Sequence, residues 1–246
     1  MADCKIYSTL QIGAFHTNHC EDFLIHEQIG SNKILIAVLD GCTMGTESVF
    51  ASMLIGKILR KIAKKNFYKE FTDGLESNLK IELKEIIYQL FQDIKSIKNQ
   101  LFLDTVELLS TLIIGLVECN KRQAEFLVIG DGLIHFDGNL FEFEQNDRPD
   151  YLAYHLSENF EYWYNVQKQF LSVSYFKDLS ICTDGIFTFK NLNKKENQKA
   201  EEEIIAYLLK DDQYAEFNNF LNRKIRFIKN KWGHVVTDDL AIIRIR

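Results

Sequence analysis

Residues 34–41 read ILIAVLDG, an apolar run rich in branched side chains that ends in Asp-Gly. Two later runs end in the same dipeptide, EFLVIGDG at residues 125–132 and LSICTDG at residues 179–185. Runs of this kind predict strands, and the runs that end at Asp40 and Asp184 are too apolar to form the arms of an exposed hairpin. A fourth run, DDLAIIRI at residues 238–245, begins with two acids instead. We therefore expect several buried strands that each carry a carboxylate at one end.

Between the first two of these runs, apolar residues recur at helical spacing through residues 49–62 and 83–97, which predicts two long amphipathic helices. Two more helices are predicted at residues 204–209 and 214–228. The predicted order of strands, two helices, strands, helices and a final strand favours a layered α+β fold over a regularly alternating α/β sheet. The chain has one proline, no repeat and no Gly/Ser tract, so we expect a single domain over residues 1–246.

The chain is acidic, with 29 Lys and Arg residues against 35 Asp and Glu residues and a net charge of −6. It lacks the basic face that nucleic acids and membrane surfaces require, so we expect neither partner. The longest nearly uncharged apolar run, residues 108–117, is about half the ~20 residues that a membrane-spanning helix needs. The five cysteines are scattered and form no Cys-x-x-Cys pair, which predicts reduced thiols in a cytoplasmic protein and no disulfide framework.

The acids at the predicted strand ends are the candidate functional residues. If the strand ends lie at one side of the fold, their carboxylates meet and repel one another unless cations lie between them. Asp-Gly is also a favoured hairpin turn, and Asp137-Gly138 is predicted to be one. Oxygen ligands without a thiolate or histidine cluster suit Mg²⁺ or Mn²⁺ better than zinc. His16, His19 and Cys20 lack a second ligand pair at zinc-finger spacing, so we do not expect zinc there.

Six short motifs in order carry a resemblance to a known family. The chain is similar to the protein phosphatase 2C family of metal-dependent Ser/Thr phosphatases, most of all to its bacterial branch. The motifs are GAFHTNHCED at 13–22, AVLDG at 37–41, STLIIG at 110–115, VIGDG at 128–132, CTDGIF at 182–187 and TDDLAII at 237–243.

The resemblance implies an αββα sandwich, in which two antiparallel sheets pack face to face between outer helices and a dinuclear Mg²⁺ or Mn²⁺ centre lies at one rim. The implied reaction is hydrolysis of phosphoserine or phosphothreonine in a phosphorylated protein by a water that bridges two metals, without a covalent enzyme intermediate. We expect a monomer. The implied ligands are Asp40 for both ions, Asp184 and Asp238 for the first, the Gly41 carbonyl with Glu21 or Asp22 for the second, and Asp131 for a third, weaker ion.

Three positions depart from the family pattern. His16 stands near the place of an arginine that clamps the substrate phosphate, and we expect it to contact phosphate in that role. Cys42 follows the first Asp-Gly, where many relatives have a histidine proposed as general acid, and Asp239 stands where Asn is usual.

These departures leave an alternative open, a catalytically weak or inactive module that binds metal and recognises phosphoproteins. A further alternative is a haloacid-dehalogenase-like phosphatase with Asp40 as covalent nucleophile. That mechanism needs a second Asp two residues later, where this chain has Cys42.

Overall fold

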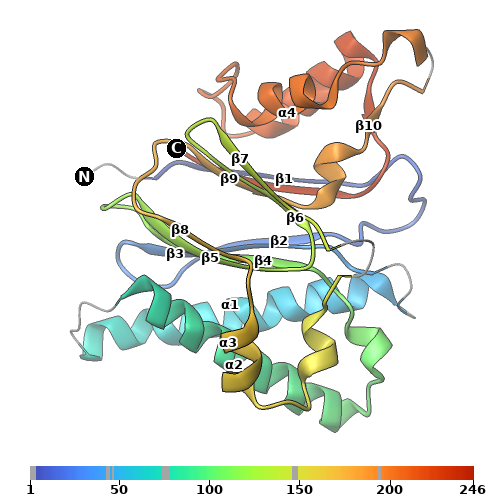
Figure 1. Cartoon of the computed structure of the whole chain (residues 1–246). Coiled ribbons are helices and arrows are strands. Elements are labelled where there is room, and N and C mark those ends of the chain that lie inside the picture. The colour runs from blue at the N-terminus through green and yellow to red at the C-terminus, as the bar shows by residue number, and fades with distance from the viewer. Residues whose placement is uncertain (1–3, 43–44, 46, 74–77, 146–148, 193–194) are drawn as a thin grey trace.

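The computed structural model describes residues 4–42, 45, 47–73, 78–145, 149–192 and 195–246. Figure 1 shows four layers, with one set of helices above an upper sheet and a second set below a lower sheet. This architecture confirms the α+β sandwich that the sequence predicts.

The upper sheet has the strand order β1-β12-β9-β6-β7, with every neighbouring pair antiparallel. The last strand of the chain therefore lies between β1 and β9, inside the sheet. Asp137 and Gly138 form the predicted turn between β6 and β7, and both have positive φ angles, as tight two-residue hairpins require. The strands are β1 (Ile6–Gln11), β12 (Leu240–Ile245), β9 (Leu179–Cys182), β6 (Gly132–Phe136) and β7 (Asn139–Phe143).

The lower sheet has the order β2-β3-β4-β5-β8 and is also antiparallel throughout. Strand β3, the second of the five, is buried on both faces. Ile36 and Val38 pack between the two sheets, whereas Leu35, Ala37 and Leu39 pack under the lower helices. This two-sided burial explains why residues 34–39 show no polar alternation. The strands are β2 (Phe23–Gln28), β3 (Lys33–Leu39), β4 (Leu112–Glu118), β5 (Gln123–Ile129) and β8 (Phe170–Val173).

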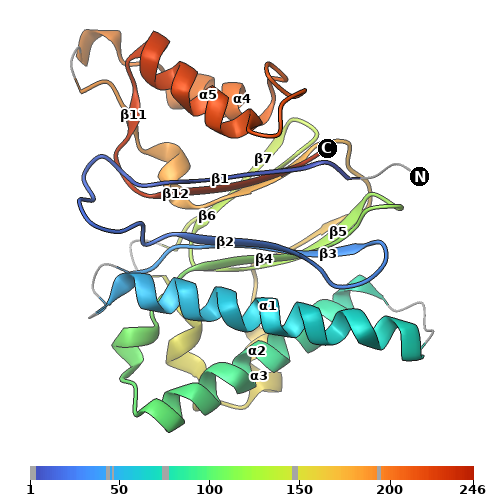
Figure 2. The ribbon, with the colours of Figure 1, turned by 180° about the vertical axis from the view of Figure 1, so that it is seen from behind.

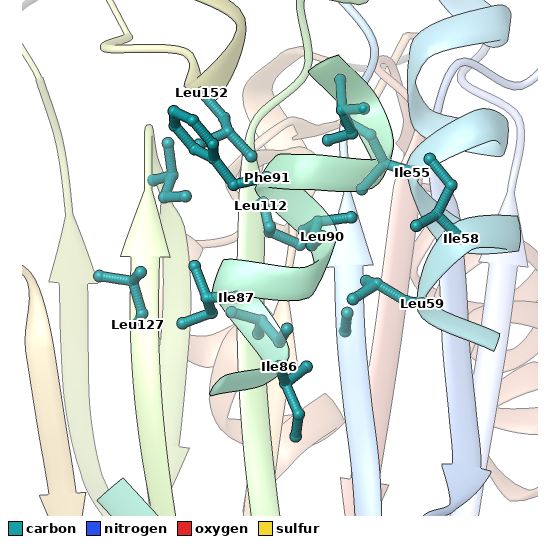
Figure 3. Close-up of a cluster of buried hydrophobic side chains, with 14 of the residues drawn as sticks. Ile55, Ile58, Leu59, Ile86, Ile87, Leu90, Phe91, Leu112, Leu127 and Leu152 are labelled. Atoms are coloured by element: carbon teal, nitrogen blue, oxygen red, sulfur yellow. The ribbon is translucent and has the colours of Figure 1, made fainter. Parts of the chain in front are cut away.

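Three helices cover the outer face of the lower sheet, namely α1 (Ser48–Asp73), α2 (Leu79–Leu101) and α3 (Phe160–Val166). The Asn78 side chain caps α2 by accepting a hydrogen bond from the backbone N–H of Lys80 at 2.9 Å. Figure 3 shows Ile87, Leu90 and Phe91 of α2 among side chains from α1 and the sheet. These are residues of the predicted second stripe, so the helical spacing identified the buried face correctly.

The outer face of the upper sheet is covered by α4 (Glu201–Leu209), α5 (Phe220–Phe227) and a π-helical turn, η5 (Ile228–Trp232). The predicted helix at 214–228 is wrong in its first part, because α5 begins only at Phe220. Tyr214 has a φ of 76°, which no right-handed helix accepts. No helix of the described residues is both long enough and apolar enough to cross a bilayer.

Four 3₁₀ turns and a small antiparallel strand pair complete the described elements. They are η1 (Thr105–Leu108), η2 (Leu152–His155), η3 (Asp184–Phe187), η4 (Lys195–Asn197), β10 (Phe189–Lys190) and β11 (Val235–Val236).

Candidate metal centre

The predicted ligands lie where strands begin or end, at one rim of the sandwich. Asp40 follows β3 directly, and Asp131 follows β5 after one glycine. Strands β3 and β5 both pair antiparallel with β4, so they run in the same direction and end at the same edge. In the upper sheet, Asp184 follows β9 while Asp238 precedes the antiparallel strand β12. The topology therefore delivers four of the predicted ligands from two sheets to one side of the molecule.

Asp22 is the most deeply buried of these acids, with 2% of its surface exposed. The Thr183 hydroxyl donates a hydrogen bond of 2.6 Å to its Oδ2, and no donor among the described residues reaches its buried Oδ1. Burial, with the charges of Asp184 and Asp239 in addition, raises the pKa of Asp22 to about 8. The Asp22 carboxyl is thus held in a place that disfavours its negative charge.

Asp40 faces the Asp22 carboxyl, and its pKa is raised well above the ordinary value by burial and then by the charges of Asp22 and Asp184. Burial together with the charges of Asp131 and Asp238 raises the pKa of Asp184 to about 6. Burial also raises the pKa of Asp131. These acids therefore lie within electrostatic reach of one another, as the sequence predicted.

No Lys or Arg in the described part of the chain forms an ion pair with Asp22, Asp40, Asp131 or Asp184. A cluster of carboxylates without a protein cation can stay together by holding protons or by binding cations. The first option agrees with the raised pKa values, and the second is the chemistry that the sequence predicts.

Glu21 and Gly41 are linked by a backbone hydrogen bond beside this cluster. The Ser48 hydroxyl donates to Glu21 Oε1 at 2.5 Å, and the Glu21 carbonyl accepts hydrogen bonds from the Gly41 N–H at 3.2 Å and the Ser52 hydroxyl at 2.6 Å. A Cβ atom on Gly41 would lie 2.0 Å from the Ser48 carbonyl oxygen, so only glycine fits. This close approach fixes the position of the backbone directly after Asp40.

Asp239 has a larger role at the rim than its sequence position suggested. It is 2% exposed, and its carboxylate accepts hydrogen bonds from the backbone N–H groups of Gly13, at 2.7 Å, and Glu21. His16 Nδ1 lies 3.2 Å from the same carboxylate, while His16 Nε2 lies 3.1 Å from Asp238 Oδ1. Asp239 thus ties the chain before β2 to the start of β12. In this structure, both ring nitrogens of His16 contact carboxylates rather than facing open space.

Tyr151, which no sequence pattern singled out, also belongs to this region. Its hydroxyl lies within hydrogen-bonding reach of the Cys42 thiol, and its pKa is raised by burial, by Cys42 and by the charges of Asp40 and Asp131. The Cys42 N–H donates to the Leu109 carbonyl at 3.1 Å. A cysteine and tyrosine pair therefore occupies the place next to Asp40 where the resemblance leads one to expect a histidine.

The donor set fits a hard divalent cation. Among the described residues, no three His, Cys, Asp or Glu side chains already converge on one point at ligand distance. The acids nevertheless offer only oxygen, and within the described part of the chain no hydrogen-bond donor reaches the buried Asp22 Oδ1. Mg²⁺ and Mn²⁺ favour such oxygen ligands, and a bound cation reverses the electrostatic cost of grouping carboxylates.

Comparison with solved structures supports the fold. RsbX in complex with magnesium is 17% identical with a TM-score of 0.57, over 98% of this chain and 94% of that chain. The catalytic domain of the serine threonine protein phosphatase PstP, with two manganese ions, is 15% identical with a TM-score of 0.61, over 98% and 97%. A bacterial serine phosphatase carrying an R161E mutation is 12% identical with a TM-score of 0.66, over 99% and 98%. At these identities the likeness shows a shared fold.

A search of curated protein sequences finds no match. A family profile, described as protein phosphatase 2C, matches residues 15–222 and so includes the predicted ligands from Glu21 to Asp184, while Asp238 lies beyond it. This match leaves the haloacid-dehalogenase-like alternative without support. Since it covers most of the sequence and agrees with the αββα fold, the chain belongs to the protein phosphatase 2C family.

Proposed function

We propose that the protein is a Mg²⁺- or Mn²⁺-dependent phosphatase that hydrolyses phosphoserine or phosphothreonine in a phosphorylated protein, and that it acts as a monomer. The observation that carries this proposal is the cluster around Asp22, where buried carboxyls meet without a pairing Lys or Arg from the described residues, and Asp22 Oδ1 has no donor among those residues. The family membership and the ions named for RsbX and PstP support it further.

The proposed ligands are those that the resemblance implies. Two ions would supply positive charge that neutralises the phosphoryl oxygens and acidifies a water molecule for attack on phosphorus. Asp40 would hold both ions, Asp184 and Asp238 would hold one, the Gly41 carbonyl with Glu21 or Asp22 would hold the other, and Asp131 would hold a third, weaker ion.

The remaining residues orient these acids. Thr183 holds one oxygen of Asp22 and leaves the other available, while Ser48 fixes the Glu21 carboxylate. Asp239 anchors the backbone of Gly13 and Glu21, which keeps the segment before β2 at the rim. Pre-placed ligands of this kind reduce the cost of assembling a metal site.

His16 is the proposed phosphate contact. It lies at the rim beside Asp238, and its Nε2 would be available to a phosphoryl oxygen only after the contact with Asp238 is broken. Because of this contact and of Cys42 in place of histidine, a metal-binding module that recognises phosphoproteins without turning them over is the second candidate.

The test is hydrolysis of p-nitrophenyl phosphate and of a phosphoserine peptide by the purified protein with Mn²⁺. We expect activity that disappears in Asp40→Asn and persists in Asp93→Asn, a matched control whose carboxylate pairs with Lys61 between α1 and α2. Activity no higher than that of Asp40→Asn would refute the enzyme. Calorimetry on the same samples would then support the second candidate if Mn²⁺ and the phosphopeptide still bind.

A further inference from the structure

Two cysteines lie together at the end of the sandwich opposite the acidic rim. Cys4 is two residues before β1, and Cys119 follows the last residue of β4 and opens the hairpin to β5. Both views of the molecule place the start of β1 beside this hairpin (Figures 1 and 2). Because β1 belongs to the upper sheet and β4 to the lower one, the two cysteines face each other across the interface between the sheets.

The two thiols are in contact. The Cys119 thiol lies within hydrogen-bonding reach of the Cys4 sulfur and of the Cys4 backbone N–H. Both side chains pack against the cluster of apolar residues that fills the space between the sheets, and both are half-buried. They are therefore neighbours with partial access to small solutes.

The backbone on each side is fixed by hydrogen bonds. The Cys119 N–H donates to the Asn32 carbonyl at 2.8 Å. Next to Cys4, the Lys5 N–H donates to the Arg246 carbonyl at 2.8 Å, and the Arg246 N–H donates to the Lys5 carbonyl at 3.0 Å. These hydrogen bonds hold the backbone beside each cysteine in place, which keeps the two sulfurs in contact.

The other cysteines lack such a partner. Cys182 is fully buried in β9. Cys20 lies at the acidic rim, where its thiol donates to the Gln11 carbonyl at 3.6 Å, and Cys42 lies next to Asp40 and Tyr151. Among the described residues, Cys4 and Cys119 are thus the pair placed for a cross-link.

We propose that Cys4 and Cys119 are a modification site, which a peroxide converts into a reversible disulfide that links the two sheets. The sequence predicts reduced thiols without a disulfide framework, and the proposal adds that this pair can be oxidised; the wide separation of the two cysteines in the sequence hid their contact. The inference concerns the end of the fold remote from the metal centre and does not depend on phosphatase activity.

The reaction balances with hydrogen peroxide as the oxidant. The Cys4 thiolate attacks one peroxide oxygen, the O–O bond breaks, and one water leaves once the released hydroxide is protonated. The Cys119 sulfur then attacks the Cys4 sulfenic sulfur, and the S–O bond breaks to release a second water that includes the Cys119 proton. Two thiols lose two electrons in total, and the peroxide gains them.

The surroundings favour this order of attack. The hydrogen bond to Cys4 and then burial raise the pKa of Cys119, so Cys119 keeps its proton and acts second. The positive charge of Arg122 lies close enough to lower that pKa in part, which helps the pair to carry a negative charge. A disulfide between residues 4 and 119 would close a long loop, and long loops restrict the unfolded chain most.

The test treats the full chain with one equivalent of hydrogen peroxide, blocks remaining thiols with N-ethylmaleimide and measures the intact mass. We expect a loss of 2 Da before alkylation, two fewer alkylated thiols after it, and a proteolytic fragment that joins Cys4 to Cys119, all reversed by dithiothreitol. Cys4→Ser and Cys119→Ser should each prevent the cross-link, whereas Cys20→Ser should form it normally. The oxidised wild-type protein should unfold roughly 5–15 °C higher than the reduced protein.

Two outcomes would overturn the proposal. One is peroxide-treated protein that gains oxygen on single cysteines without the 2 Da loss. The other is a cross-link that maps to any other pair. If Cys119→Ser fails to fold, Cys4→Ser still tests the proposal, because Cys4 lies outside every described strand and its substitution should leave the fold intact.

Discussion

Replacing Asp22 with Asn should make the metal-free protein more stable at pH 8 and remove part of its pH dependence. Asn has nearly the same shape as Asp, and its amide oxygen can still accept the hydrogen bond that Thr183 donates. The substitution removes a charge that the structure holds in a buried place without a paired cation. Burying an unpaired charge costs stability, so its removal should be favourable.

The sign and size follow from the pKa of Asp22, which burial raises from 3.8 to about 8 in the folded protein. The unfolded chain has released this proton at neutral pH, whereas the folded chain keeps it. For an acid with a raised folded pKa, stability is fully present below the unfolded value and is lost as pH rises through the folded value. At ~1.4 kcal/mol per pKa unit, the loss between pH 6.5 and pH 8 is about 2 kcal/mol.

Two histidines with shifted pKa values could also change stability near this pH range. Burial lowers the pKa of His135 to about 4, so His135 affects stability only below its ordinary value of 6.5. The pKa of His155 is raised, because its hydrogen bonds to Asp150 and Glu158 outweigh the opposing effect of burial. Its contribution also falls as pH rises, but it is the same in wild type and in Asp22→Asn, so it cancels in the difference between them.

The assay is urea unfolding in EDTA at pH 6.5 and at pH 8, with circular dichroism as the measure of folded protein. We expect the unfolding free energy of wild type to fall by about 2 kcal/mol more than that of Asp22→Asn. Equal pH slopes, or a variant that is less stable than wild type at pH 8, would refute the view that Asp22 is buried under electrostatic strain.

Three further predictions, the last with a control variant, concern other parts of the structure. Asp184→Asn should abolish high-affinity Mn²⁺ binding in calorimetry, and unchanged binding would remove Asp184 from the ligand set. Gly185→Ala should lower the unfolding free energy by about 3 kcal/mol in urea, since its Cβ would lie 1.8 Å from a backbone oxygen just before β12. Asp178→Asn should cost about 3 kcal/mol in the same assay, because Asp178 pairs with the fully buried Arg244. Asp212→Asn, which removes a 58% exposed partner of the same arginine, should cost less than about 1 kcal/mol.

The strands that carry the acids could be predicted because their residues are buried on both faces. The apolar runs at 34–39, 179–182 and 240–245 match β3, β9 and β12 closely. By contrast, β7 (Asn139–Phe143) is largely exposed and has no long apolar run, so the predicted Asp137-Gly138 turn before it was its main signal. The start of α5 was missed because Tyr214 adopts a positive φ, which the helical spacing of its neighbours does not reveal.

Of the site, only the acids could be predicted from the sequence, because each of them lies at the end or the start of a recognisable strand. The contacts that orient them join residues far apart in the chain, 161 positions for Asp22 with Thr183 and 226 for Gly13 with Asp239. No local spacing encodes such pairs. The Asp-Asp pair before β12 was visible in the sequence, but the deep burial of Asp239 follows from packing against Gly13 and Glu21.

The place of β12 inside the upper sheet has a consequence for the synthesis of the protein. Ribosomes make β1 before any other described strand, yet its neighbour in the sheet is β12, which follows every other described element. A nascent chain must therefore carry β1 unpaired, and long-range pairing of this kind is slow and exposes strand edges to aggregation. Asp239 directly precedes β12 and is therefore synthesised just before it. Until then, the growing chain lacks the carboxylate that binds the backbone N–H groups of Gly13 and Glu21 at the acidic rim.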